Sequence, residues 1–331
     1  MRLLALCSGL AIVAAMAAAA APGDSQFNGK WNISVNGDTP RTRAWWLEVN
    51  GAGTDLVKGR FVGAPGGQVD DIPKISISDG ELRFAFDRRY RRDGNPRVTQ
   101  KGLYWARIEN GKLKGTFEIE GDPSTYLEWI GVRAPALAEK DDGTWRRGDP
   151  IQLLSGRDLS GWVPLVSNKP PGWTVKDGVL VNSPNASDLV SDRKFWNFDL
   201  HVEFLVGVRS NSGVGLRGRY EVQIYDDFDD LPSKHGNGAL YSRITPRINV
   251  SREPGEWQTF DIRLVGRQVS VTLNSIKIID RATIEGLTAI AQDPNETEPG
   301  PIILQGDHGF VEFRRVTIFP LTNAPQPVRN R

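Results

Sequence analysis

Residues Phe198–Val206 read FDLHVEFLV, in which apolar and polar residues alternate from Phe198 to Phe204. Successive side chains of a β-strand point to opposite faces of a sheet, so the stretch predicts a strand with one buried and one polar face. The polar face carries Asp199, His201 and Glu203. The segments 213–217 and 220–225 alternate in the same way and predict two further strands of this kind.

The polar faces of these two segments carry two glycines and four polar side chains: Gly213, Gly215, Arg217, Glu221, Gln223 and Tyr225. If the three strands are neighbours, one face gathers carboxylates, a guanidinium, an amide, an imidazole and a phenol. Its glycines then let a ligand approach the backbone. An ordinary solvated sheet face is the alternative, but the lack of Lys in this set favours a groove that binds hydroxyl groups.

The surrounding chain consists of short strand-like segments without helical periodicity. In the second half these segments are 173–181, 259–265, 269–279, 302–305 and 311–319, and long loops interrupt them at 182–196, 226–238 and 281–300. In the first half they are 30–35, 43–49, 56–62, 74–77, 81–86, 103–108, 112–119 and 126–132. Asp79-Gly80 and Asn110-Gly111 predict tight hairpins. We therefore predict an all-β protein in which a jelly-roll β-sandwich follows a small barrel-like or sandwich domain.

The predicted organisation has five parts. They are a signal peptide at 1–21, an N-terminal β domain of unknown function at 22–135, a polar linker at 136–148, the β-sandwich at 149–321 and a disordered tail at 322–331. Five Trp residues of the N-terminal domain could line a sugar-binding mouth, although core positions are the favoured interpretation: Trp31, Trp45, Trp46, Trp105 and Trp129.

The first residues are typical of a leader that is removed. Arg2 precedes an apolar run from Leu3 to Ala20, and Pro22 follows, so we expect an exported protein, periplasmic or secreted. A membrane anchor is the alternative, and no second apolar run is long enough to span a bilayer. The single Cys, Cys7, lies in this leader, so the mature chain forms no disulfide. The net charge of +1, from 41 basic and 40 acidic residues, gives no electrostatic support for a nucleic-acid partner.

Few residues suggest catalysis by themselves. The sequence has no Gly-rich phosphate loop before a helix and no HExxH, CxxC or GxSxG motif. His308, in the stretch LQGDHG at 304–309, would carry protons if it borders a polar groove. The acidic loop Asp226–Asp230 could bind calcium, but a solvated turn is the favoured interpretation.

A series of motifs follows in a characteristic order. They are LSGRDLSGW at 154–162, WTVKDGVL at 173–180, FDLHVEF at 198–204, NSG at 211–213, LRG at 216–218, YEVQI at 220–224, GALY at 238–241, GEW at 255–257 and LQGDHG at 304–309. Through them the chain from about Ile151 to Phe319 resembles the 3-keto-disaccharide (3-keto-glycoside) hydrolase domain family. The resemblance implies a concanavalin-like sandwich and a sugar substrate, and it says nothing about residues 22–148.

The resemblance also implies a reaction, the cleavage of glycosides that carry a ketone at sugar carbon 3. The ketone acidifies the proton on carbon 2, so a base could remove it, the substituent on carbon 1 would leave, and water would add. The expected catalytic residues are His308 as the base, Arg217 as the group that stabilises the enolate, and Glu203 or Glu221 as the orienting or donating partner.

The remaining expectations concern the substrate and a metal. The candidate substrate-binding residues are Gln223, Gln305, Asn211, Tyr225, Tyr241 and Trp257. No cofactor is certain, but a divalent cation such as calcium, held by Glu221 and Asp226, could replace Arg217. The alternative functions are a non-catalytic carbohydrate-binding protein of the cell envelope and a structural module, because the fold does not choose between them.

Overall fold

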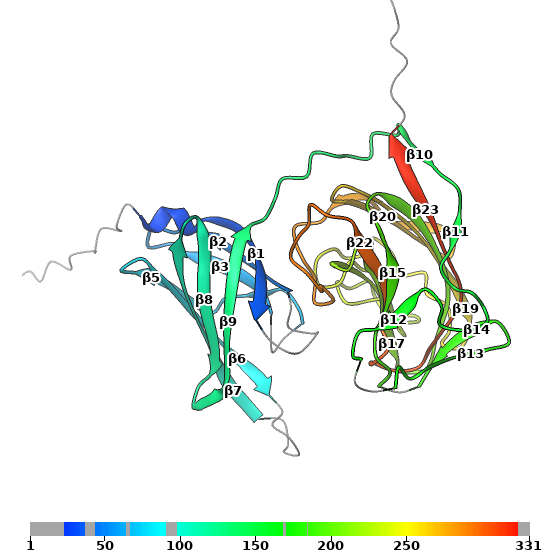
Figure 1. Ribbon diagram of the computed structural model, residues 1–331, viewed down its shortest axis with the longest axis horizontal. Coiled ribbons are helices and arrows are strands. Elements are labelled where there is room, and N and C mark those ends of the chain that lie inside the picture. The colour runs from blue at the N-terminus through cyan, green and yellow to red at the C-terminus, as the bar shows by residue number, and fades with distance from the viewer. Residues whose placement is uncertain are drawn as a thin grey trace, which may run out of the picture.

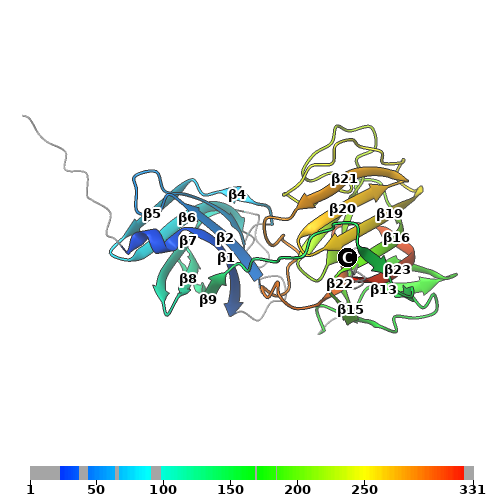
Figure 2. The same ribbon diagram turned by 90° about the horizontal axis from the view of Figure 1, so that it is seen from above.

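The computed structural model describes residues 23–36, 44–63, 67–90, 98–167, 170–183 and 185–323. The expected signal peptide, and the expected tail from residue 324 on, lie outside these residues. The described chain is almost entirely β-structure, with one 3-10 helix, Asp24–Phe27, and two units that lie side by side (Figures 1 and 2). No helix in the described ranges is long and apolar enough to cross a membrane.

The first unit is one antiparallel sheet of nine strands. They are β1 Gly29–Asn36, β2 Ala44–Asn50, β3 Lys58–Val62, β4 Asp70–Asp71, β5 Lys74–Ser78, β6 Glu81–Tyr90, β7 Val98–Glu109, β8 Lys112–Ile119 and β9 Asp122–Arg133. The order β4-β3-β2-β1-β9-β8-β7-β6-β5 brings β1 against both β2 and β9, so the sheet curls into an up-and-down barrel that is open between β4 and β5. The hairpins predicted at Asp79-Gly80 and Asn110-Gly111 are present, and all four residues have left-handed φ angles of 51 to 74°.

Three tryptophans, Trp31, Trp45 and Trp129, belong to the interior of the barrel, whereas Trp46 packs against the sandwich. Trp31, Trp45 and Trp129 are each 1% exposed, and the Trp45 ring lies edge-on to Phe61 at 5.7 Å between centroids. Trp105 alone is partly exposed. The core interpretation is therefore correct for these buried rings, which fill the barrel instead of lining a sugar-binding mouth.

The second unit is a sandwich of two sheets. The larger sheet has the order β13-β14-β23-β16-β19-β20-β21, and β10 and β11 also pair with β23. Its strands are β10 Trp145–Arg147, β11 Ile151–Gln152, β13 Trp173–Lys176, β14 Val179–Asn182, β16 Phe198–Val206, β19 Trp257–Val265, β20 Gln268–Leu273, β21 Ile276–Thr283 and β23 Val311–Asn323. The smaller sheet has the order β12-β15-β22-β17-β18, with β12 Trp162–Pro164, β15 Leu189–Phe195, β22 Gly300–Leu304, β17 Asn211–Leu216 and β18 Tyr220–Tyr225.

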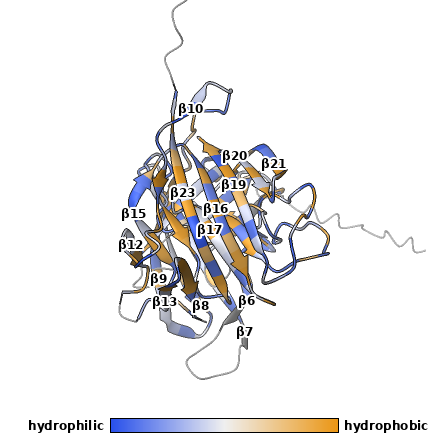
Figure 3. Cartoon of the chain, turned by 90° about the vertical axis from the view of Figure 1, so that its right-hand side faces the viewer, coloured by the Kyte–Doolittle hydropathy of each residue, from blue (hydrophilic) through white to orange (hydrophobic). Residues whose placement is uncertain are grey.

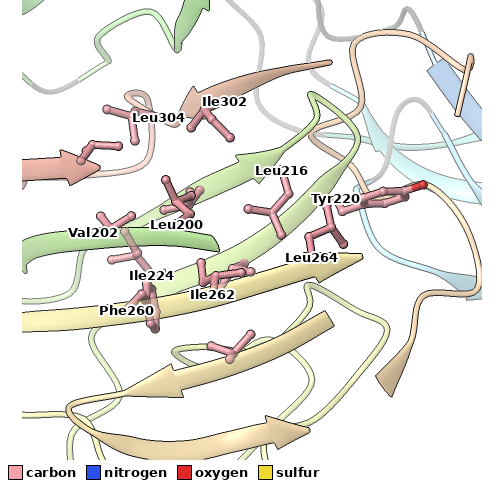
Figure 4. Packing of buried hydrophobic residues seen from close by; sticks show 14 of the residues in the cluster. Leu200, Val202, Leu216, Tyr220, Ile224, Phe260, Ile262, Leu264, Ile302 and Leu304 are labelled. Carbon is pink, nitrogen blue, oxygen red and sulfur yellow. The ribbon is translucent and has the colours of Figure 1, made fainter. Parts of the chain in front are cut away.

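The apolar faces of the two sheets meet in one core. Leu200 and Val202 of β16 in the larger sheet pack with Leu216 of β17 and Leu304 of β22 in the smaller sheet, and each is at most 1% exposed (Figure 4). Hydrophobic and hydrophilic bands alternate along β16, β19 and β23 (Figure 3). The predicted all-β, jelly-roll-like architecture is confirmed.

The prediction that the three alternating strands are neighbours in one sheet is wrong. β17 and β18 pair with each other in the smaller sheet, whereas β16 lies between β23 and β19 in the larger sheet. All three strands have one apolar face, because β16 lines the core from one side and the β17–β18 pair lines it from the other. Their polar faces therefore point away from each other, and alternation within a strand contains no information about this choice.

Other differences concern strand boundaries. The predicted loop 182–196 contains β15, and the predicted linker 136–148 contains β10, which pairs with β23. The predicted strands 173–181 and 269–279 are each a hairpin, because Asp177-Gly178 and Asn274-Ser275 adopt left-handed turn conformations.

Candidate functional site

The outer face of the smaller sheet carries a row of polar residues. Leu189 lies opposite Leu304, and Leu304 lies opposite Val214, so the adjacent positions Asp188, Gln305 and Gly213 also stand side by side. The amide of Gln305 donates to the carbonyl of Gly213 at 3.0 Å, and Gly213 is the partner of Gln223 on β18. Because Leu304 and Val214 face the core, these four positions face outward.

Glu221 stands in the next row, opposite Gly215, and its side chain leans over Gly213. A Cβ atom at Gly213 would lie 2.4 Å from Glu221 Oε1, so the glycine makes room for the carboxyl group. The segment after β21 covers this face: Thr288 Oγ1 accepts a hydrogen bond from the amide of Glu221 at 3.0 Å. Glu221 is consequently only 3% exposed.

The environment of Glu221 favours its protonated form. Burial, and then the nearby carboxylate of Asp188, raise the pKa of Glu221 to about 8, although the charge of His308 opposes both. A carboxyl group in such surroundings holds its proton at neutral pH and can donate it. We call Asp188, Glu221, Gln223, Gln305 and His308 the Glu221 cluster.

His308 lies in the loop that follows β22. Its Nδ1 contacts the carboxylate of Asp307, and its side chain is 48% exposed. Its carbonyl accepts from the amide of Asn211 at 3.2 Å, and Asp188 Oδ1 accepts from the amide of Gly306 at 3.0 Å. These bonds hold the loop against β17 and β15. With Asp307 ionised, Nδ1 carries the proton of the neutral ring and Nε2 is its basic nitrogen.

Further predicted residues gather around this cluster. Tyr225 is opposite Asn211 at the end of the β17–β18 pair and is 38% exposed. The amide of Tyr241 donates to the carbonyl of Glu221 at 2.9 Å, so Tyr241 lies along the free edge of β18. Burial and then the charge of Glu221 raise the pKa of Tyr241.

Three residues in or beside the Glu221 cluster were not predicted from the sequence. Asp188 was hidden in the stretch expected to be a loop, and Asp307 stands directly before His308, where the pair Asp-His was visible but unused. His235, whose ring centroid lies 5.0 Å from that of Tyr241, comes from the long loop after β18.

Glu203 and Trp257 do not belong to this site. They lie on the outer face of the larger sheet, where Arg314 contacts the carboxylate of Glu203 and stacks 4.4 Å from the Trp257 ring centroid. The core of the sandwich separates them from Glu221, so the structure does not bring them together with the other predicted site residues.

Arg217 is also displaced from its predicted role. It lies in the β17–β18 turn with a φ of 52° and is fully buried, with its guanidinium 4.2 Å from the Trp196 ring centroid and Nη2 bonded to the carbonyl of Gly266. Burial lowers its pKa to about 10. The side chain fixes the end of the sandwich, and it cannot stabilise an enolate over Gly213.

The proposed cation ligands do not form a set. Asp226 Oδ2 accepts from the amide of Arg209 at 2.6 Å, and Asp227 of the same acidic loop accepts from the amide of Asn237 at 2.8 Å. These carboxylates order their own loop, whereas Glu221 holds a proton. Among the described residues there is no group of three His, Cys, Asp or Glu side chains that could hold a metal ion.

A pocket with a volume of about 370 Å³ lies on the outer face of the larger sheet. Asp199, His201, Asp261 and Arg263 line it. Arg263 pairs with Asp199 at 3.1 Å, and His201 pairs with Asp261 at 2.9 Å. Because these charges neutralise one another, we place the candidate site at the Glu221 cluster.

Solved structures similar to the chain include two proteins of Parabacteroides distasonis, each described as a candidate glycosyl hydrolase. One is 29% identical over 56% of this chain and 91% of its own, with a TM-score of 0.45. The other is 23% identical over 52% and 94%, also with a TM-score of 0.45. The carbohydrate-binding module CBM66 of Bacillus subtilis is 11% identical over 48% and 92%, with a TM-score of 0.32.

No curated protein matches the sequence. The family described as 3-keto-alpha-glucoside-1,2-lyase-like domain matches residues 149–319, which are more than half of the chain and contain the whole Glu221 cluster. The chain belongs to this 3-keto-disaccharide hydrolase family.

Proposed function

We propose that the chain cleaves glycosides whose sugar carries a ketone at carbon 3, and that the Glu221 cluster is its active site. The observation that carries the proposal is the pairing of two opposite proton-transfer groups on one sheet face. Glu221 is buried and protonated, and the exposed His308 is oriented by Asp307. One group can donate a proton and the other can accept one at the same pH.

The first step is removal of the carbon-2 proton by Nε2 of His308. The electron pair of the C–H bond forms the enolate, whose negative charge develops on the carbon-3 oxygen. When the enolate collapses, a double bond forms between carbons 1 and 2 and the glycosidic oxygen leaves carbon 1. Glu221 gives its proton to that oxygen, so an alcohol departs instead of an alkoxide.

Hydrolysis needs a second step, in which water adds to the unsaturated ketone. Water adds to carbon 1 of the unsaturated ketone, its proton returns to Glu221, and the imidazolium of His308 returns its proton to carbon 2. The net result is a 3-keto sugar and an alcohol. Release before water adds would give a lyase product, and the same residues serve both outcomes.

Gln223 and Gln305 are the candidate donors to the enolate and to sugar hydroxyls, in place of Arg217. Both lie in the polar row beside Gly213. Gln305 Oε1 is buried and has no hydrogen-bond partner among the described residues. A buried acceptor without a partner carries a free-energy cost of about 1–3 kcal/mol, which a sugar hydroxyl that donates to it would offset.

The test is to incubate the purified protein with a 3-keto-disaccharide and, separately, with the unoxidised disaccharide. We expect cleavage of the keto sugar only, because the parent sugar lacks an acidified carbon-2 proton. Equal cleavage of both sugars would contradict the proposal. Binding of the keto sugar without turnover would show a carbohydrate-binding protein instead. We also propose export, on the basis of the leader sequence alone.

A further inference from the structure

The barrel contacts the sandwich through buried side chains. Trp46 of β2 is fully buried, and the guanidinium of Arg243 lies 4.1 Å from its ring centroid. A Cβ atom at Gly286 would lie 2.1 Å from Trp46 Nε1, so the indole packs directly on this glycine. Asn32 of β1 donates to Glu296 Oε2 at 2.6 Å and to the carbonyl of Pro294 at 2.9 Å. The two units therefore form a specific interface in addition to their covalent linker.

The edge of the barrel reaches the segment beside the Glu221 cluster. The amide of Val69, next to β4, donates to Ser242 Oγ at 2.8 Å. A Cβ atom at Gly67 would lie 3.4 Å from the Cβ of Ala289, which is one residue after Thr288. Ser242 directly follows Tyr241, so β4 lies along the segment that borders β18.

Hydrogen bonds give the lateral order of the groups. The loop carrying His308 is bonded to β17 through Asn211, β17 pairs with β18, and β18 is bonded to Tyr241. Tyr241 is followed by Ser242, whose hydroxyl accepts from the amide of Val69, the residue before Asp70 in the barrel. The charge of Asp70 also raises the pKa of Tyr241. The proton donor Glu221 thus lies between His308 and Asp70.

The groups on the barrel side suit a sugar. The rings of Tyr241 and His235 offer apolar faces, and Nε2 of His235 is buried without a hydrogen-bond partner among the described residues. Asp70 Oδ1 accepts a hydrogen bond from the side-chain Nε2 of Gln68 at 2.7 Å. Aromatic rings beside a carboxylate and an amide form the usual surroundings of a bound carbohydrate.

We propose that the barrel supplies part of the substrate site, with Asp70 as a residue that binds the leaving-group sugar. The inference rests on the proposed function for the identity of the ligand. Since Glu221 donates to the glycosidic oxygen and His308 acts on the ketone ring, the leaving sugar extends from Glu221 toward Tyr241 and Asp70. Substrates with a small leaving group do not reach Asp70.

The test compares two substrates on the full chain: a 3-keto-disaccharide and a methyl 3-keto-glycoside. Asp70→Asn and Asp70→Ala should lower kcat/KM for the disaccharide about 10-fold or more, mainly through KM, because a hydrogen bond to a charged group is lost. Both variants should leave the methyl glycoside unchanged. Asp71→Asn is the matched control, because Asp71 is the adjacent, exposed residue of β4 and points to the other face.

A second measurement is independent of turnover. The pKa of His235 is lowered by burial and by Lys234, and Asp70 opposes this. Proton NMR of the three histidines should show a further decrease of the His235 pKa in Asp70→Asn and no change in Asp71→Asn.

The outcomes separate the two proposals. Equal losses for both substrates, or an unchanged His235 pKa, would overturn the role of Asp70 and leave the proposed function intact. If the unaltered protein cleaves neither substrate, the proposed function fails. Calorimetry with the unoxidised disaccharide then decides about Asp70: weaker binding by Asp70→Ala supports the role, and equal or undetectable binding overturns it.

Discussion

The substitution Glu221→Gln tests the protonated carboxyl group most directly. Gln has nearly the same shape as protonated Glu, but it neither ionises nor donates a transferable proton. The folded-state pKa of Glu221 is about 8, against an ordinary value of 4.5. Because each pKa unit corresponds to about 1.4 kcal/mol, ionisation of Glu221 in the unfolded chain costs the wild-type protein up to ~5 kcal/mol of folding stability near pH 8.

The sign of the pH dependence follows from the same shift. Below the unfolded pKa both states are protonated and the cost is zero. As the pH rises toward the folded pKa, only the unfolded chain ionises, so wild-type stability falls. We expect Glu221→Gln to match the wild type near pH 4 and to gain on it steadily up to pH 8, as measured by urea unfolding across this range. Parallel pH profiles for the two proteins would refute the raised pKa.

Activity provides the second half of this test. Glu221→Gln should lower kcat for a 3-keto-disaccharide by about 100-fold or more, because the leaving alkoxide receives no proton. A 3-keto-glycoside with a nitrophenol leaving group needs little protonation and should lose less than about 10-fold. An equal loss for the two substrates would mean that Glu221 does not act as the acid, even if its pKa is raised.

Three further substitutions follow from the geometry. His308→Ala should lower kcat on the keto sugar at least ~100-fold, and near-normal turnover would remove His308 from the mechanism. Glu203→Gln should keep kcat within about 2-fold, because Glu203 faces outward from the opposite sheet, and a large loss in the same assay would contradict the assignment of the site. Gly213→Ala should abolish turnover while the protein still folds by circular dichroism, because the new Cβ would lie 2.4 Å from Glu221 Oε1; normal activity would show that the carboxyl group is not held there.

The sequence predicts which residues share one face of a strand, but it does not predict which strands lie in the same sheet. Alternation with period two placed Glu221 and Gln223 on the outward face opposite Gly213 and Gly215, and the register confirms this. The same pattern in β16 said nothing about which of the two sheets contains the strand. Pairing between distant strands depends on side-chain packing across the core, which no single segment encodes.

Arg217 shows a second limit of period-two reasoning. The alternation continued one residue beyond the end of β17, but Arg217 adopts a left-handed φ of 52° in the turn, so its side chain leaves the outer face. Asp188 shows the converse. It precedes the strand β15, whose sequence LVSDRKF contains three consecutive charged residues. This charged run interrupts the alternation of apolar and polar residues, so the strand resembles a loop in the sequence.

The stretch after β21, residues 286–296, links the barrel to the surroundings of Glu221. Thr288 Oγ1 accepts a hydrogen bond from the amide of Glu221, and Ile290 packs over Gly215. The same stretch meets the barrel at Gly286, under Trp46, and at Glu296, which Asn32, Tyr220 and Arg267 surround. Glu296 is fully buried and bonded from both units, so the contacts at Gly286 and at Glu296 hold the two ends of the stretch. Burial is the largest cause of the raised pKa of Glu221. The barrel therefore stabilises the segment that shields this proton donor from water.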